Sequence, residues 1–348
     1  MQIKIVTYTL AKQRDMKAFV MQKYGKKEIL QLTDTPVPIL KEDEVLVEIH
    51  AAGLNVLDAK IKAGEFKLIL PYQLPLILGH DVAGTITEVG TKVTQFKVGD
   101  EIYSRVADFN IGTFAEYIAI KEDDVALKPD NISMEEAASV PLVALTAWQS
   151  LVEKANLKKG QKVFVQAGSG GVGTIAIQLA KYLGATVATT ASEKSFAMLK
   201  ELGADVLIDY KKEDFEAILK DYDVVLNSQD TRTLEKSLRV LKPGGKAISI
   251  SSPPTPELAK AIGASWFVKI ALSLLSYGIR RKAKKAGVDY SFLFMRADGK
   301  QLWEISKLIK QQVIRPVVDK VFPFNQLNEA MEYIETGRAK GKVVLKIK

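Results

Sequence analysis

A glycine-rich turn between an apolar run and a helical segment is the clearest chemical signal in the sequence. Residues 163–165 are apolar, and residues 167–173 place Gly168, Gly170 and Gly173 in a GxGxxG spacing. These glycines allow a tight turn, let the backbone approach a pyrophosphate and let a helix pack on the strand, while free N–H groups at the helix start bind phosphate. We therefore predict a dinucleotide site contacted by Gly168, Ser169, Gly170, Gly171, Val172 and Gly173.

The bare motif also has a purely structural interpretation, because glycine-rich turns close many strands without binding a ligand. Its context favours the binding interpretation. Ile175, Leu179 and Leu183 fall on one stripe of a helix directly after the turn, and Gly184 ends that helix.

The residues that follow the next predicted strand indicate which dinucleotide is bound. An Asp or Glu about 20 residues beyond the turn would hold a ribose 2′-hydroxyl and favour NAD. Here residues 189–194 supply hydroxyl groups and a lysine, which suit a 2′-phosphate. We therefore expect NADPH, bound by Thr190, Ser192 and Lys194. Glu193 opposes this assignment, and Ser192 is alternatively the N-cap of the next helix.

Composition sets wide limits on the rest of the chain. With 348 residues, 47% of them hydrophobic, we expect two domains. The absence of cysteine excludes disulfides, a thiolate nucleophile and a thiolate metal site. The net charge of +8 can attract a phosphorylated cofactor, but it is spread along the chain and no nucleic-acid motif accompanies it. Residues 1–15 lack the features of a signal peptide, so we expect a cytoplasmic protein whose first strand starts at Met16 after a poorly ordered or partly strand-forming extension.

The pattern of predicted secondary structure changes along the sequence. Alternating strands such as 44–50 and 82–89 indicate a β-rich first domain. From Pro141 helices and strands alternate, with strands at 223–227 and 246–250, and Pro243, Gly244 and Gly245 turning into the latter. After a helix at 300–311, strands at 317–322 and 342–347 return to the first domain. We assign 16–140 and 296–348 to the first domain, and 141–295, with a helical insert at 253–290, to a doubly wound nucleotide domain.

Several motifs in a fixed order carry a family resemblance: residues 51–58, 79–84 with Gly90, 98–100, 112–117, 167–173 and 341–344. The chain resembles the medium-chain dehydrogenase/reductase superfamily, in its zinc-less quinone oxidoreductase and enone (2-alkenal) reductase branch. The resemblance implies an α/β fold in which a doubly wound parallel Rossmann sheet is inserted into a β-rich, GroES-like catalytic domain. It also implies a possible homodimer.

The resemblance also identifies what is missing. Zinc-dependent relatives hold metal with cysteines and a histidine, whereas Asn55 stands here at the first cysteine position, and His80 and Asp81 have no thiolate partners. Zinc catalysis needs three protein ligands and an open position. We therefore expect no metal site, and expect His80 to be a hydrogen-bonded residue beside the cleft.

A site without a Lewis acid suits hydride addition to a conjugated double bond, because positioned hydrogen-bond donors can stabilise the charge on the carbonyl oxygen. The resemblance implies an NADPH-dependent enone or quinone reductase, in which hydride passes from nicotinamide C4 to the β-carbon and the enolate is protonated from water or a nearby acid. The alternative is an NADPH-binding redox sensor or membrane-associated interaction protein with incidental turnover.

Positions that match motifs of the family give further candidate site residues. Lys60 and Asn55 are the catalytic candidates: Lys60 beside the nicotinamide ribose, and Asn55 in the cleft floor. Lys194 and Tyr210 match residues around the 2′-phosphate, Ser251 would face the nicotinamide, and Thr146 lies on the helix entering the cofactor domain. Without the family, Lys60 is an exposed helix lysine, and Tyr210 could equally be a surface packing residue at a strand end. The acceptor pocket depends on Tyr72, Phe109, Phe294 and the insert.

The insert combines an apolar run at 261–279 with Arg280, Arg281, Lys282, Lys284 and Lys285. Such a basic amphipathic helix can lie on an anionic membrane. Lys269 interrupts the apolar run, which argues against a spanning segment. The sequence favours a helical cover over the substrate pocket or a partner-facing helix, with membrane contact through 261–285 as the second possibility.

The role of Lys60 is directly testable. Lys60→Ala should lower the rate of enone reduction, because the cation that steadies the developing enolate is lost, while NADPH binding survives at least partly. Steady-state turnover together with a fluorescence titration of NADPH measures both quantities. Unchanged turnover would remove Lys60 from the site.

Overall fold

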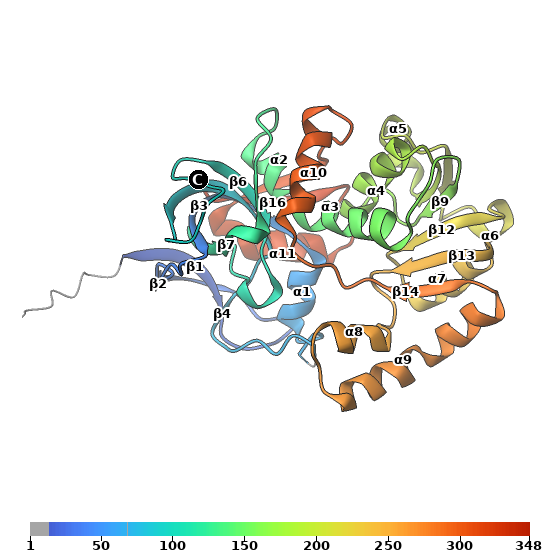
Figure 1. The fold of residues 1–348 in the computed structure, drawn as a ribbon, viewed down its shortest axis with the longest axis horizontal. Helices are drawn as coiled ribbons and strands as arrows, with labels where there is room; N and C mark the ends of the chain where they lie inside the picture. Colours follow the sequence, from blue (N-terminus) through green and yellow to red (C-terminus); the bar gives the residue numbers. More distant parts are fainter. Residues whose placement is uncertain (1–13, 68) are drawn as a thin grey trace, which may run out of the picture.

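The computed structural model describes residues 14–67 and 69–348, whose strands form three sheets (Figure 1). The smallest sheet has the antiparallel order β2-β1-β4 and lies at the start of the chain. Its strands are β1 (Asp15–Met21), β2 (Gln31–Pro36) and β4 (Leu76–Ile77). The first strand thus begins one residue before the predicted Met16, and the expected extension falls almost entirely outside the described residues.

Six parallel strands form the sheet of the cofactor domain, in the order β11-β10-β9-β12-β13-β14. They are β9 (Lys162–Val165), β10 (Thr186–Ala191), β11 (Val206–Asp209), β12 (Tyr222–Asn227), β13 (Leu241–Ser249) and β14 (Asp289–Phe292). The chain runs outward from β9 to one edge and then from β12 to the other. This reversal beside the carboxyl end of β9 is where doubly wound sheets bind ligands.

Helices cover both faces of this sheet, which is why its strands are apolar at successive positions. Val163 and Val165 of β9 pack in a core with α3 and α4, whereas Phe164 packs on the opposite face with α6, α7 and α9. The helices are α3 (Pro141–Trp148), α4 (Gly171–Tyr182), α5 (Phe196–Glu201), α6 (Phe215–Ile218), α7 (Thr231–Leu238), α8 (Pro256–Ala261) and α9 (Trp266–Lys285).

The third sheet has the order β15-β16-β3-β5-β6-β8, with β7 also paired to β3. Its strands are β3 (Glu44–Leu54), β5 (Asp81–Val89), β6 (Glu101–Arg105), β7 (Tyr117–Lys121), β8 (Val125–Leu127), β15 (Val318–Pro323) and β16 (Lys342–Lys346). Its helices are α1 (Val56–Ala63), α2 (Met134–Ala138), α10 (Gly299–Lys310) and α11 (Leu327–Glu335). Because β16 pairs with β3, the end of the chain completes the sheet that β3 begins (Figure 1).

The predicted fold class is therefore confirmed: a doubly wound parallel sheet is inserted into a β-rich domain. The proposed limits of the two domains stay predictions. One strand start is wrong, because β13 begins at Leu241 and not at Lys246. Leu241 pairs with Tyr222, and Lys246 pairs with Val224, so Pro243 to Gly245 form a bulge inside the strand and not the turn before it.

A glycine substitution tests the packing of the cofactor turn. In Gly173→Ala the new Cβ would lie 2.5 Å from the Ala167 carbonyl oxygen and 2.6 Å from Gly168 Cα. Since backbone cannot move aside cheaply, we expect a loss of about 1–3 kcal/mol in the free energy of unfolding. The matched control is Gly278→Ala in α9, where the Cβ meets no atom within 4 Å and a gain of about 0.5–1 kcal/mol is expected. Urea unfolding measures both changes, and equal midpoints for Gly173→Ala and wild type would contradict the packing argument.

Candidate active site

The glycine-rich turn joins β9 to α4 and is held in place by the end of β10. Thr190 accepts hydrogen bonds from the N–H of Gly168 at its carbonyl oxygen, 3.0 Å away, and from the N–H of Ala167 at its hydroxyl, 3.2 Å away. Ala167 itself adopts φ +49°, a left-handed conformation that closes the turn. The first N–H groups of α4, at Gly171, Val172 and Gly173, have no acceptor within the helix and form a place for an anion.

A hollow of about 1170 Å³ adjoins this turn. Its walls come from the turn, the end of β10, the segment after β11, the start of α7 and the loop between α11 and β16. Five residues predicted to bind cofactor line it together: Ser169, Thr190, Ser192, Lys194 and Tyr210. The structure therefore brings the predicted phosphate-binding residues to one place, although their roles stay predictions.

The hollow is predominantly basic, with six cations and two carboxylates in its lining. Asp214 pairs with Lys236 at 2.6 Å, and this hydrogen bond lowers the pKa of Asp214. Just outside the lining, Glu193 pairs with Lys212 at 2.6 Å and raises the pKa of that lysine. The carboxylate that opposed NADPH in the sequence is thus neutralised. Among the described residues, four lining cations have no acidic partner: Lys194, Lys211, Arg338 and Lys340.

Sequence reasoning missed Arg338 and Lys340, which lie more than a hundred residues beyond the glycine-rich turn and strands β10 and β11. Their loop reaches the hollow because the N–H of Gly341 donates to the carbonyl oxygen of Ser169, 2.8 Å away. The available signal was their position directly before the recognised motif at 341–344, which made them neighbours of that motif in the fold.

A buried polar junction lies where the two domains meet. Lys342 Nζ is 3.0 Å from Asp81 Oδ2 and 2.5 Å from Asn55 Oδ1, and Asn55 Nδ2 is 3.0 Å from the same Asp81 oxygen. The other oxygen of Asp81 accepts from the N–H of Leu142 at 2.8 Å. The stem of Lys342 lies beside Gly171, where a Cβ would approach its Cδ to 2.9 Å. We call Asn55, Asp81 and Lys342 the domain junction.

The two catalytic candidates differ in their surroundings: Asn55 is the N-cap of α1, and Lys60 lies within the helix. Asn55 is buried and both ends of its side-chain amide are engaged in the domain junction. Lys60 is half-buried one turn further along the helix, and no described carboxylate pairs with it. The catalytic assignment of both residues stays a prediction.

His80 is fully buried and hydrogen-bonded through Nδ1, as the sequence analysis expects, while its position beside the cleft stays a prediction. Its Nδ1 is 2.6 Å from Asp58 Oδ1, while Asp58 Oδ2 accepts from the N–H of Asn55 at 2.8 Å. Asp58 therefore ties the start of α1 to the histidine.

Seven predicted cofactor residues are not in the lining of the hollow: five belong to the adjoining glycine-rich turn and the start of α4, and Thr146 and Ser251 lie elsewhere. Thr146 is buried in α3 and donates its hydroxyl to the Leu142 carbonyl oxygen, 2.7 Å away. Ser251 is exposed after β13 and donates to the Gln229 carbonyl oxygen at 2.6 Å. Both hydroxyls can still accept a hydrogen bond, and their assignment to the cofactor stays a prediction.

Aromatic side chains lie on the catalytic-domain side. The rings of Tyr72 and Phe109 are 6.0 Å apart, and burial raises the pKa of the Tyr72 phenol, which donates to the Asp108 carbonyl oxygen. Phe294 packs both with the cluster that contains Tyr72 and with a cluster formed by α8 and α9. The insert therefore contacts the same aromatic side chain that the sequence analysis placed at the acceptor pocket.

Comparison with known proteins agrees with this architecture. Residues 41–130 match the alcohol dehydrogenase GroES-like domain, and residues 202–345 match the family described as zinc-binding dehydrogenase. The zebrafish (Danio rerio) protein named NAD(P)H oxidoreductase RTN4IP1, mitochondrial, is 34% identical, over 98% of this chain and 94% of its own length. The Arabidopsis thaliana protein named NADPH-dependent alkenal/one oxidoreductase, chloroplastic, is 36% identical, over 95% of this chain and 80% of its own length.

Among solved structures, the quinone oxidoreductase from Coxiella burnetii superposes with a TM-score of 0.84 at 30% identity, covering 96% of this chain and all of that one. The chain belongs to the medium-chain dehydrogenase/reductase superfamily. The relatives reported above are named as oxidoreductases, and two of the names include NAD(P)H or NADPH. This medium-chain dehydrogenase/reductase is therefore a pyridine-nucleotide-dependent oxidoreductase.

The zinc named in the description of the family matched at 202–345 finds no set of three ligands around His80 among the described residues. Over residues 14–67 and 69–348, no three His, Cys, Asp or Glu side chains come together as a metal site. Around His80, Asp58 is engaged by the histidine and by backbone, and Asp81 is paired with the Lys342 ammonium. A divalent cation at this place would be repelled by that lysine.

The domain junction yields a stability prediction. Lys342→Met leaves the Asp81 carboxylate buried without its cation, and we expect a loss of about 3–5 kcal/mol in the free energy of unfolding. Adding Asp81→Asn should recover part of that loss. The control on the same strand is Lys346→Met, whose exposed pair with Glu135 at 3.0 Å should contribute less than about 1 kcal/mol. Urea unfolding of wild type, Lys342→Met, Asp81→Asn and the double variant measures the coupling, with Lys346→Met measured alongside, and strictly additive losses would show that the pair is not coupled.

Proposed function

We propose that this protein uses NADPH to reduce the activated C=C bond of α,β-unsaturated carbonyl compounds or quinones, without zinc. The observation that carries the proposal is the basic hollow beside the glycine-rich turn. Its unpaired lysines and arginine give a 2′-phosphate a favourable environment that a bare ribose does not need. The name of the Arabidopsis relative, which specifies NADPH and an alkenal or alkenone, supports the same assignment.

The residues present fit the two phosphate-bearing parts of NADPH. The N–H groups at the start of α4 would hold the pyrophosphate, since they lack helical acceptors. Lys194 and Arg338 would hold the 2′-phosphate, with Lys211 and Lys340 adding positive charge. Ser192 would contribute its hydroxyl. The half-buried Lys60 would face the acceptor end of the cofactor.

NADPH supplies a hydride when bound, and the protein must then stabilise negative charge that collects on the acceptor oxygen. The ammonium of Lys60 serves this purpose because no described carboxylate neutralises it. Tyr72, Phe109 and Phe294 would form apolar walls for a conjugated acceptor. Zinc independence rests on the domain junction, where Lys342 already supplies the positive charge beside Asp81.

Substrate assays test the proposed reaction. NADPH oxidation should be fast with short enals, cyclic enones or quinones, and should persist after treatment with a chelator and removal of metal by gel filtration. Saturated alcohols with NADP⁺ serve as the control and should give negligible turnover. Metal-dependent oxidation of alcohols, with no reduction of any enone or quinone, would contradict the proposal.

Cofactor selectivity provides a separate prediction. Wild type should bind NADPH more tightly than NADH, and Lys194→Ala or Arg338→Ala should each raise the dissociation constant for NADPH roughly 10- to 100-fold, because a charge-assisted hydrogen bond is lost. The dissociation constant for NADH should not change.

Lys200→Ala removes an exposed lysine of α5 outside the hollow and is the matched control. Fluorescence titration gives all of these constants. Equal affinity of wild type for the two nucleotides would contradict the assignment of NADPH.

A further inference from the structure

Helix α9 carries two different faces. Leu272, Ser276, Ile279 and Ala283 are buried against the cofactor domain and α8. Six large side chains point away from that core, with exposed fractions from 49% to 74%: Trp266, Phe267, Ile270, Leu274, Leu275 and Tyr277. The other large exposed hydrophobic side chains of the described residues are distributed over many elements, so this group is a concentrated apolar surface. We call it the α9 surface.

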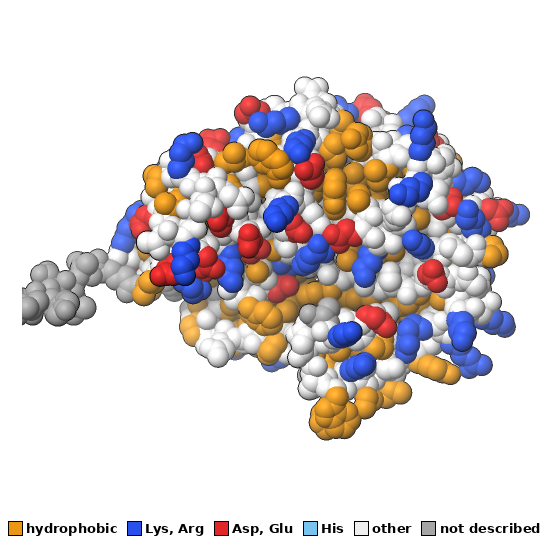
Figure 2. All heavy atoms as spheres, in the orientation of Figure 1, with side chains coloured by type: hydrophobic (Ala, Val, Ile, Leu, Met, Phe, Trp, Pro, Cys, Tyr) orange, Lys and Arg blue, Asp and Glu red, His pale blue; other side chains and the backbone are white. Residues whose placement is uncertain are grey.

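Figure 2 shows hydrophobic side chains gathered along the lower edge of the molecule, where Figure 1 places α9. At 100° per residue the six side chains span about half of the helix circumference, over a length of about 18 Å. So wide an arc is broader than the narrow stripe that inserts into a groove of another helix. The α9 surface is therefore better suited to a flat partner than to the groove of a single helix.

Positive charge accompanies the α9 surface. Residues 258–288 include seven Lys or Arg and no Asp or Glu. Lys282 pairs with Glu235 at 2.5 Å, and Arg280 is hydrogen-bonded to Ser273 and Ser276. Besides Arg280, five of the cations have no acidic partner among the described residues: Lys260, Lys269, Arg281, Lys284 and Lys285. The preferred partner is therefore both apolar and anionic.

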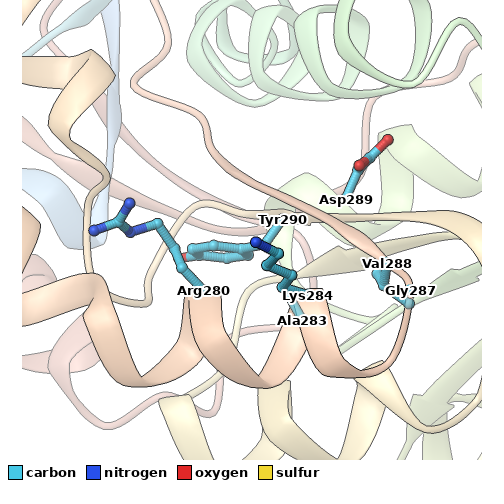
Figure 3. A pocket seen from close by; sticks show the side chains of 7 residues that line it. All are labelled: Arg280, Ala283, Lys284, Gly287, Val288, Asp289 and Tyr290. Atoms are coloured by element: carbon cyan, nitrogen blue, oxygen red, sulfur yellow. The ribbon is translucent and has the colours of Figure 1, made fainter.

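The basic end of α9 also borders a hollow of about 550 Å³, lined by Arg280, Lys284 and Tyr290 among others (Figure 3). In Figure 3 the side chains of Arg280 and Lys284 extend from α9 on the side of Tyr290, whereas the Asp289 carboxylate points away from the helix. Lys284 is thus available to an anionic group that approaches the end of the helix.

We propose that the α9 surface docks the protein on an anionic lipid bilayer. The helix lies in the plane of the membrane, with its apolar side chains among the upper acyl chains and its unpaired cations at the phosphate level. Trp266 and Tyr277 are side-chain types that favour this interface. No described helix is long and apolar enough to cross a membrane, which agrees with surface docking.

A second copy of the chain fits the α9 surface less well. A two-fold interface brings the same surface of both copies together, and α9 has no acidic residue to offer the cations of its partner. The sequence favoured a helical cover over the substrate pocket or a partner-facing helix, with the membrane second, whereas the outward-facing side chains of α9 lead us to propose the membrane.

Vesicle co-sedimentation tests the proposal with the full chain. Wild type should bind phosphatidylcholine vesicles that contain 30% phosphatidylserine and should be released by 0.5 M salt. The variant Arg281→Gln, Lys284→Gln, Lys285→Gln should lower the partition coefficient roughly 100-fold, as expected for three cations at an anionic surface. The matched control Lys26→Gln, Lys121→Gln, Lys200→Gln removes the same charge from exposed lysines on other elements and should bind almost as wild type does.

Depth of insertion distinguishes docking from simple charge attraction. The chain has three tryptophans, so quenching by dibrominated phosphatidylcholine in the same vesicles should affect wild type and be largely lost in Trp266→Phe. Unfolding midpoints equal to that of wild type confirm that the variants fold. Absence of binding to anionic vesicles, equal binding by the two triple variants, or concentration-dependent dimerisation that the α9 changes abolish without any vesicle binding would each overturn the proposal.

Discussion

The buried ion pair between Lys342 and Asp81 joins two strands of the catalytic sheet at the place where this sheet contacts the cofactor domain. Asp81 begins a central strand of the catalytic sheet and accepts from the first turn of α3, while Lys342 begins the final strand and lies against the glycine-rich turn. A buried pair costs desolvation, and we interpret its presence as a means of fixing one arrangement of the domains. Through Gly341 and Ser169, the same strand holds the cofactor turn itself.

Charge is less evenly distributed in space than along the sequence. The residues that give the net charge of +8 are spread along the sequence, but the fold concentrates unpaired cations in the hollow beside the glycine-rich turn and along α9. Each concentration faces a different anion in our proposals: the phosphates of a nucleotide in the hollow, and lipid head groups at α9. Glu193 and Asp214 are each paired with a lysine, and the remaining carboxylate of the lining, Glu213, does not outweigh the four unpaired cations.

Local signals predicted local structure well. The strand, glycine turn and helix at β9 and α4 lie where sequence placed them, because apolar spacing and glycines act within a few residues. Long-range contacts were not predictable in this way: Lys342 reaches Asn55 across 287 residues, and Arg338 reaches the hollow only through the fold. The sequence predicted a turn at Pro243 to Gly245, but the pairing of Leu241 with Tyr222 places these residues inside a strand.

A crystal structure with bound NADP⁺ tests the central claim most directly. The account predicts the pyrophosphate at the start of α4, the 2′-phosphate between Lys194 and Arg338, and the nicotinamide near Lys60, with the pair between Lys342 and Asp81 intact. A nucleotide bound elsewhere, a 2′-phosphate pointing to solvent, or a metal ion replacing Lys342 beside Asp81 would contradict it.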